Sequence, residues 1–224
     1  LNIALVNELS LILPAVGVDV EDVLNAASTK WNFHRYTPGI GVGGHCIPVD
    51  PYYLMLRAEE MGIGAELIGA ARTVNRSMPI KAAQHITEMM TKNGISTIGA
   101  NALLLGWSYK PNIADSRETP AEPLTKQLVQ AGLNVMIHDP YANEMEVDLS
   151  FEEKVSIYSN LETLEDIDIV VLVTAHSNYN HLFMKEVFHL CRNKLIYDGR
   201  RVLNIEELRK MGWTVGAIGR PLNI

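Results

Sequence analysis

The sequence predicts an α/β protein in which a helical first half precedes a parallel β-sheet. Two observations indicate this fold class. Up to about residue 95, apolar residues recur at the spacing of helix faces. Beyond it, short apolar runs rich in β-branched residues alternate with helical stretches, a pattern typical of a parallel sheet covered on both faces. We therefore divide the chain into a helical domain, 1–95, and a sheet domain, 96–224.

The first half contains four expected helices, over 1–14, 19–27, 52–61 and 65–92. The first is apolar nearly all round, which predicts a buried helix, and it lacks an N-cap. The chain is thus expected to begin inside a helix, as the C-terminal part of a longer protein. Pro51 should open the third helix and Gly62 should end it. Pro79 should kink or divide the fourth, which is either a dimer seam or packed internally.

Strands and helices alternate in the second half. The expected strands are 102–105, 135–137, 167–173, 195–197 and 215–218, and the helices between them are 120–130, 182–190 and 205–211. Polar clusters follow three of these strands, at 109–112, 174–176 and 198–201. Ligands of open parallel sheets bind beyond the carboxyl ends of the strands, so these clusters are candidate ligand contacts.

Composition excludes several classes of protein. The net charge of −7 and the lack of a basic stripe argue against nucleic acid as a partner. No apolar run is long enough to span a membrane. The two cysteines exclude a disulfide framework and favour the cytoplasm. The histidines do not share metal-ligand spacing with Cys46, so no metal is expected.

Cys46 lies in a run of glycines and prolines, 38–51, and is the strongest candidate for chemistry. The glycines let the backbone turn back on itself and approach a ligand closely. A thiol on such a loop, with Asp50 four residues later, indicates a nucleophile beside a proton-handling group. The alternative is a small, inert core cysteine. The same run matches G-x-G-x-x-G, but no strand precedes it and prolines follow, so it is not a dinucleotide fingerprint.

Three separated motifs, 38–50, 105–120 and 197–200, resemble the UDP-glucose/GDP-mannose dehydrogenase family. That family has an N-terminal NAD-binding domain, a central helical domain with a long dimer helix, and a Rossmann-like C-terminal domain that holds the sugar nucleotide. The chain resembles the last two, and the NAD domain is expected to be absent from it. The resemblance implies a homodimer formed through the long helix.

The residues around the cysteine narrow the expected substrate. His45 before it and the run 48–53 after it resemble dehydrogenases of UDP-N-acetylhexosamines. We expect oxidation of C6 of UDP-N-acetyl-D-mannosamine to the uronate with two NAD⁺. The alternatives are UDP-N-acetylglucosamine or UDP-glucose as substrate. The 224 residues alone are expected to bind UDP-sugar and to oxidise nothing.

The resemblance also implies residue roles. Cys46 forms the thiohemiacetal and thioester, and Asp50 orders or deprotonates the attacking water; capping a helix at Pro51 is the alternative for Asp50. Substrate binding falls to Gly43, Gly44, His45, Tyr109, Lys110 and Arg200. Arg117 is expected to reach NAD, or else to pair with Asp115 or Glu118. For Arg200 the alternative is a structural pair with Asp198.

Two other readings stay open. A noncatalytic nucleotide-binding or dimerisation module would keep the fold without a reactive thiol. An unrelated cysteine hydrolase would need a histidine partner held by a third group, and the sequence offers none that is convincing.

Overall fold

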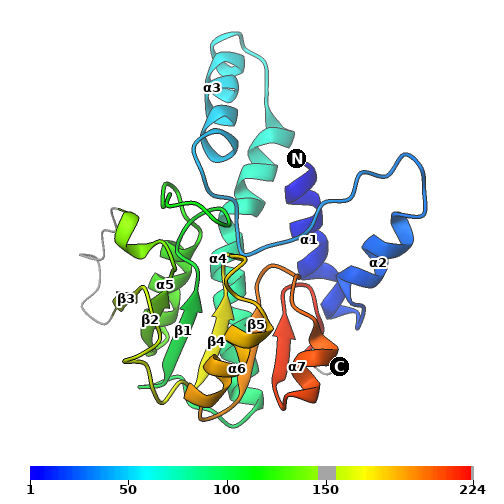
Figure 1. Ribbon diagram of the computed structural model, residues 1–224. Helices are drawn as coiled ribbons and strands as arrows, with labels where there is room; N and C mark the ends of the chain where they lie inside the picture. Colours follow the sequence, from blue (N-terminus) through cyan, green and yellow to red (C-terminus); the bar gives the residue numbers. More distant parts are fainter. Residues whose placement is uncertain (146–154, 223–224) are drawn as a thin grey trace.

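The computed structural model describes residues 1–145 and 155–222. Six parallel strands form one sheet in the order β3-β2-β1-β4-β5-β6 (Figure 1). The strands are β1 (Asn101–Leu105), β2 (Asn134–His138), β3 (Val155–Tyr158), β4 (Ile169–Leu172), β5 (Leu195–Asp198) and β6 (Thr214–Ala217). The helices are α1 (Asn2–Ala15), α2 (Val20–Ala27), α3 (Cys46–Glu60), α4 (Glu66–Lys92), α5 (Ala121–Gln130), α6 (His181–Leu190) and α7 (Ile205–Lys210), with a short 3₁₀ turn, η1 (Ala142–Glu144).

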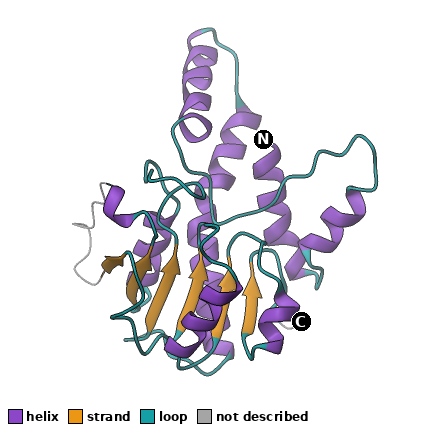
Figure 2. Ribbon diagram, viewed as in Figure 1, coloured by secondary structure: helices purple, strands orange, loops and turns teal. Residues whose placement is uncertain are grey.

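Helices cover both faces of the sheet, as the sequence predicts (Figure 2). Alternate strand residues point to opposite faces, and β1 shows the consequence. Leu104 belongs to the hydrophobic core shared with α4 and α5, whereas Leu103 and Leu105 belong to the core shared with α6 and α7. The unpredicted strand is β3, a four-residue edge strand paired only with β2 among the described residues.

The long helix α4 joins the two halves. It runs through Pro79 without a break, so the expected division at that proline is wrong. Its first half contacts α1 and α3, and its second half packs on the sheet. There Met89 lies so close to Gly216 of β6 that a Cβ at the glycine would meet the Met89 sulfur at 2.4 Å. One continuous helix therefore contributes to both hydrophobic regions.

Helix α1 differs from its expected burial. It was expected to be buried all round, but only Ala4, Val6, Asn7 and Ser10 are buried. Leu1, Leu5 and Ile12 are more than half exposed. The helix packs against α2 and α4 on one side alone, which leaves an apolar face uncovered.

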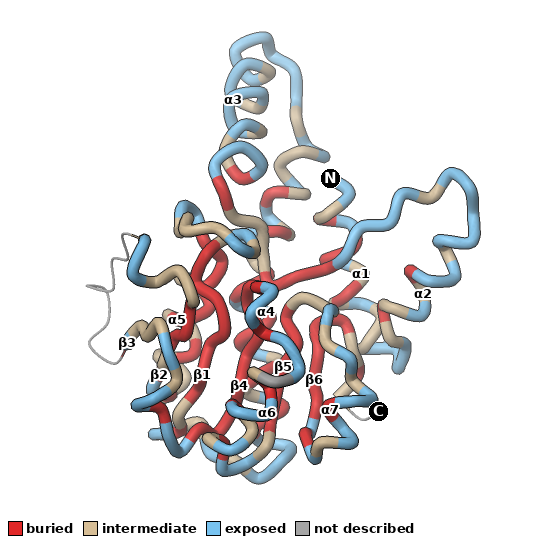
Figure 3. Tube along the Cα trace, viewed as in Figure 1, coloured by how far each residue is buried: buried red, intermediate tan, exposed pale blue. Residues whose placement is uncertain are grey.

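Helix α3 forms a projecting arm with the start of α4, and most of its surface is exposed (Figure 3). It begins at Cys46, six residues earlier than expected at Tyr52, and Gly62 (φ +70°) follows its end as expected. Pro48 is tolerated because the first four N–H groups of a helix have no intrahelical acceptor. Among the described residues, no helix is long and apolar enough to cross a membrane.

Candidate active site

Cys46 is exposed and is the first residue of α3. Asp50 lies four residues later, so both side chains project from the same face of the helix. Both line a cavity of about 480 Å³ between α3, the start of α1 and α4. The expected alternative for Asp50, capping a helix at Pro51, is wrong because the helix has already begun. A thiol and a carboxylate thus face one open cavity.

The other cysteine has the opposite environment. Cys191 is buried at the end of α6, where its thiol donates to the carbonyl of Val187 at 3.2 Å. Burial raises the pKa of its thiol to about 12. Cys191 therefore belongs to the hydrophobic core, and Cys46 is the accessible thiol.

Two buried asparagines fix the glycine loop that leads to Cys46. The side-chain oxygen of Asn7 accepts the N–H of Gly39 at 2.9 Å, and its side-chain nitrogen donates to Asn75 at 2.9 Å. Asn7 is fully buried, so each of these bonds satisfies a group that water cannot reach. The sequence reasoning missed both residues; a lone asparagine inside the apolar run of α1 was the available signal.

The glycines of the loop allow close packing against the sheet domain. A Cβ at Gly43 would lie 2.7 Å from the carbonyl of Glu118, and one at Gly44 (φ +89°) would lie 2.6 Å from the Tyr109 ring. The N–H of Gly44 donates to the carbonyl of Arg117 at 3.0 Å. That N–H already has a protein acceptor, so the substrate binding expected of Gly44 cannot use it.

Tyr109 and Arg117 therefore lie beside the glycine loop. Arg117 is largely exposed and pairs with Asp115 at 2.6 Å, the alternative foreseen for it. This pairing, more than the nearby Tyr109 and Cys46 charges, raises the pKa of Arg117. Lys110 is exposed in the same segment. His45 is the exposed residue before α3, and its side chain makes no capping hydrogen bond.

Arg200 packs against the opposite side of the loop. A Cβ at Gly39 would lie 2.9 Å from its Nη1 atom. Asp198 accepts the backbone N–H groups of Arg200, Val202 and Leu203, at 2.8 to 2.9 Å. Burial lowers the pKa of the Arg200 guanidinium, against the opposing effect of Asp198. Among the described residues, no carboxylate forms an ion pair with Arg200, so the foreseen structural pair with Asp198 does not form.

The sheet domain holds its own loop, 106–112, through a buried hydrogen-bond network. Asp139 Oδ2 accepts the N–H groups of Trp107 and Ser108, and it lies 3.1 Å from His176 Nε2. His176 Nδ1 accepts the N–H of Asn112, so Nε2 carries the ring proton. His176, in one of the clusters predicted as candidate ligand contacts, is therefore bonded within the protein through both ring nitrogens.

The structure thus brings most of the expected site residues to one loop. Cys46, His45 and Asp50 belong to the start of α3, whereas Tyr109 and Arg200 contact the glycines just before it. Lys110 lies next to Tyr109 in sequence, but no contact joins its side chain to the loop among the described residues.

Comparisons with known proteins identify the family. The model for the UDP-glucose/GDP-mannose dehydrogenase family, central domain, matches residues 1–77, and the model for its UDP binding domain matches residues 103–205. A UDP-N-acetyl-D-mannosamine dehydrogenase from Methanococcus aeolicus is 33% identical over 97% of the chain and 47% of its own length. A UDP-N-acetyl-D-glucosamine 6-dehydrogenase from Pseudomonas aeruginosa is 34% identical over 91% of the chain and 48% of its length.

Solved structures agree as well. A UDP-D-ManNAc dehydrogenase from Pyrococcus horikoshii superposes with a TM-score of 0.79 at 31% identity, covering 98% of the chain and 48% of that structure. The molecule is thus an α/β protein built from a helical and a nucleotide-binding-type domain. The chain belongs to the UDP-glucose/GDP-mannose dehydrogenase family and carries its central and UDP-binding domains. It spans about half the length of the curated relatives it matches.

Proposed function

We propose that the chain is the thiol-bearing and nucleotide-binding part of an NAD-dependent UDP-N-acetylhexosamine 6-dehydrogenase. The observation that carries this proposal is the exposed Cys46 at the first residue of α3, with Asp50 one turn later in the same cavity. Relatives named for UDP-N-acetylmannosamine and for UDP-N-acetylglucosamine support the substrate class. UDP-N-acetyl-D-mannosamine is our first choice of substrate, and the domains of the proposed part are 1–95 and 96–224.

The chemistry assigned to this chain is covalent. NAD⁺, when bound, supplies the hydride acceptor for both oxidations at C6. The Cys46 sulfur adds to the aldehyde carbon, and its proton passes to the oxygen, giving a thiohemiacetal; this capture keeps the aldehyde on the protein. Water then cleaves the acyl–sulfur bond of the later thioester, releasing the carboxylate and the Cys46 thiol. Asp50 orients that water or takes its proton.

The remaining site residues bind the two nucleotide ligands, the UDP-sugar and NAD. Arg200 has a half-buried guanidinium without an acid partner among the described residues, and such a planar fork suits phosphate oxygens. Lys110, Tyr109 and His45 complete the proposed UDP-sugar contacts. Arg117 is exposed, and its carbonyl accepts the N–H of Gly44 two residues before Cys46, so it fits the role of an NAD contact. Gly43 and Gly44 serve by letting the loop pack closely.

Two further assignments accompany the proposal. The uncovered apolar residues of α1 and α3, among them Leu5 and Leu54, support a homodimer in which α4 lies at the centre of the interface. Both cysteines are free, which suits a reducing cytoplasm.

Turnover tests the catalytic part of the proposal. NADH formation is measured with UDP-N-acetylmannosamine and with UDP-N-acetylglucosamine in a protein that joins this chain to an NAD-binding domain. We expect Cys46→Ser to lower kcat by about a thousandfold or more, because loss of a nucleophile removes the covalent route. Cys191→Ser is the matched control and should retain turnover. Normal kcat in Cys46→Ser would contradict the nucleophile and favour a noncatalytic nucleotide-binding or dimerisation module.

Measuring UDP binding tests the proposed nucleotide site separately from catalysis. We expect the 224-residue chain to bind UDP in isothermal titration calorimetry and to form no NADH from NAD⁺ and either sugar nucleotide. Arg200→Met should weaken UDP binding roughly tenfold or more, because one charge-assisted contact to phosphate is lost. Arg192→Met is the control, since Arg192 pairs with Asp168 on the far edge of the fold. Equal UDP affinity in both variants would contradict the assignment of Arg200.

A further inference from the structure

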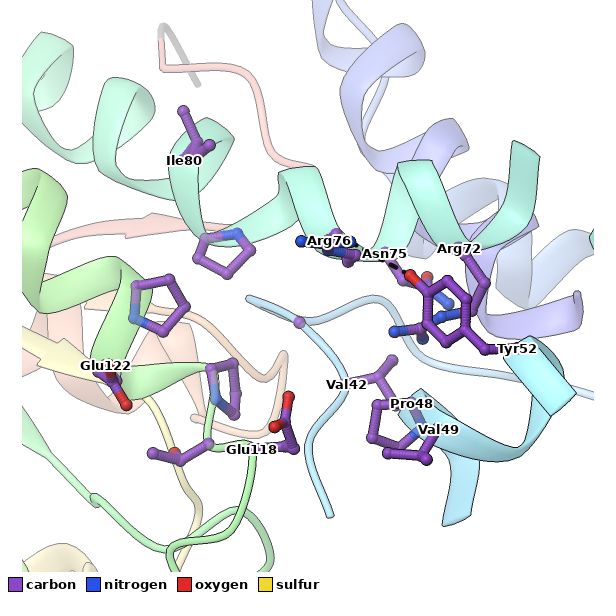
Figure 4. A pocket seen from close by; sticks show the side chains of 15 residues that line it. Val42, Pro48, Val49, Tyr52, Arg72, Asn75, Arg76, Ile80, Glu118 and Glu122 are labelled. Atoms are coloured by element: carbon purple, nitrogen blue, oxygen red, sulfur yellow. Dashed lines mark hydrogen bonds between the residues drawn. The ribbon is translucent and has the colours of Figure 1, made fainter. Parts of the chain in front are cut away.

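A second cavity, of about 710 Å³, adjoins the first: different residues of α3 line the two, and Arg72 and Asn75 of α4 line both. Figure 4 shows residues from α3, α4 and the start of α5 around it. Pro48, Val49 and Tyr52 face this cavity, whereas Cys46 and Asp50 face the first one. The volume is within the range of small-molecule sites. None of the residues proposed above to bind UDP or NAD lines it.

Two arginines of α4 form one wall of this second cavity. Arg72 is 8% exposed, and its Nε is buried without a hydrogen-bond partner. Its guanidinium lies 5.3 Å from the centre of the Tyr52 ring, and Arg76 donates to the Tyr52 hydroxyl at 3.2 Å. Among the described residues, neither arginine forms an ion pair with a carboxylate. Because a buried cation without an acid partner is costly, this wall fits an anion.

Other arginines differ in this respect. Arg57, Arg117 and Arg201 each pair with an acid, whereas Arg200, like Arg72 and Arg76, forms no ion pair among the described residues. The hydrogen bond from Arg76, together with Arg72, lowers the pKa of Tyr52 against the effect of its slight burial.

Acidic side chains come from the segment across the cavity. Glu122 is paired with Lys126 at 2.6 Å, whereas Glu118 forms no ion pair among the described residues. A free carboxylate accepts hydrogen bonds from hydroxyl groups. The cavity therefore presents anion-binding groups on one side and a hydroxyl acceptor on the other, with Val42, Pro79 and Pro120 as apolar walls.

We infer that this second cavity binds a monophosphorylated sugar, with its phosphate on Arg72 and Arg76 and its hydroxyl groups toward Glu118. Guanidinium groups bind phosphate oxygens with two parallel hydrogen bonds, and the unpartnered Nε of Arg72 supplies one such donor. The site adjoins the thiol cavity, because Arg72 and Asn75 line both, but Arg76 and Glu118 line the second cavity and not the first.

Calorimetric titration with glucose 6-phosphate, inorganic phosphate and glucose tests this site. We expect the protein to bind glucose 6-phosphate more tightly than phosphate, and glucose least. Arg76→Met should weaken the binding of both anions roughly ten- to hundredfold. Because Arg76 is exposed, this change should leave folding intact. Arg72→Met should act in the same direction. Arg57→Met, exposed on α3, is the matched control and should change nothing.

Two further variants separate this site from the others. Glu118→Gln should weaken the binding of glucose 6-phosphate and should not weaken the binding of inorganic phosphate. Arg200→Met should leave glucose 6-phosphate binding unchanged while it weakens UDP binding. The inference is overturned if neither anion binds, if Arg76→Met binds both anions normally, or if Arg200→Met abolishes binding.

Discussion

The carboxyl edge of the sheet and the start of α3 use polar side chains in opposite ways. At the sheet edge, between β1 and β4, the strand order reverses, and in open α/β sheets this is where ligands usually bind. Here the loop 106–112 is hydrogen-bonded to the side chains of Asp139, His176 and Thr174. The polar groups of these side chains therefore bond within the protein. At the start of α3, by contrast, Cys46 and Asp50 face an open cavity.

The polar side chains at the sheet edge thus fix a segment of the protein, whereas those at the start of α3 are available to a ligand. The closed network fixes the segment that carries Tyr109 and Arg117, and that segment packs against the glycine loop. The sheet domain thus positions the loop, and the helical domain presents the thiol. Variants in the two regions should accordingly change different properties: reactivity at α3 and stability at the sheet edge.

Thiol labelling should show the largest contrast. At pH 8 a thiol with a pKa of about 12 is ionised in only about one molecule in ten thousand. We expect iodoacetamide to label Cys46 at least a thousandfold faster than the buried Cys191, as followed by peptide mass spectrometry. In urea-unfolded protein both should react at similar rates. Similar rates in the folded protein would remove the distinction between the two thiols.

Asn7→Ala should destabilise the anchor of the glycine loop. The change leaves the Gly39 N–H and the Asn75 amide buried without a partner, and we expect a loss of about 2–4 kcal/mol of unfolding free energy. Urea unfolding measures it. Asn25→Ala is the matched control on α2, because Asn25 is exposed and bonds to Arg35 at the surface. If Asn7→Ala lowered the unfolding free energy no more than Asn25→Ala does, the loop would not depend on Asn7.

Asp139→Asn should change how stability depends on pH. Burial alone would raise the pKa of Asp139, but hydrogen bonds from His176 and from the backbone N–H groups of Ser108, Tyr141 and Trp107 lower it to about 2. Because the folded pKa is lowered, this contribution is complete above about pH 4 and is lost as pH falls toward 2. It amounts to about 2 kcal/mol.

Urea unfolding at pH 5 and pH 2.5 measures that contribution. Asp139→Asn should be less stable than the wild type at pH 5, with the difference shrinking at pH 2.5. The control is Asp22→Asn, which alters an exposed acid on α2. A difference that stays constant between the two pH values would contradict the assigned role of Asp139.

The sequence alone determined the class of the fold and most of its elements. Helical periodicity predicted α2 and α4 to within one residue, and apolar β-branched runs marked five of the six strands. Both signals are local, because burial of one helix face or of a whole strand imposes a period on neighbouring residues. The motifs around Cys46, Lys110 and Arg200 likewise indicated the family before any coordinates.

Only the tertiary structure decided which polar groups have hydrogen-bond or ion-pair partners within the protein and which do not. Nothing local shows that the N–H of Gly44 is bonded to Arg117, that Asn7 holds Gly39, or that Arg72 has no acid beside it. These partners lie far apart in the sequence and meet only through packing of α1, α4 and the sheet. A hydrogen bond depends on distances of a few tenths of an ångström, which sequence spacing does not encode across long loops.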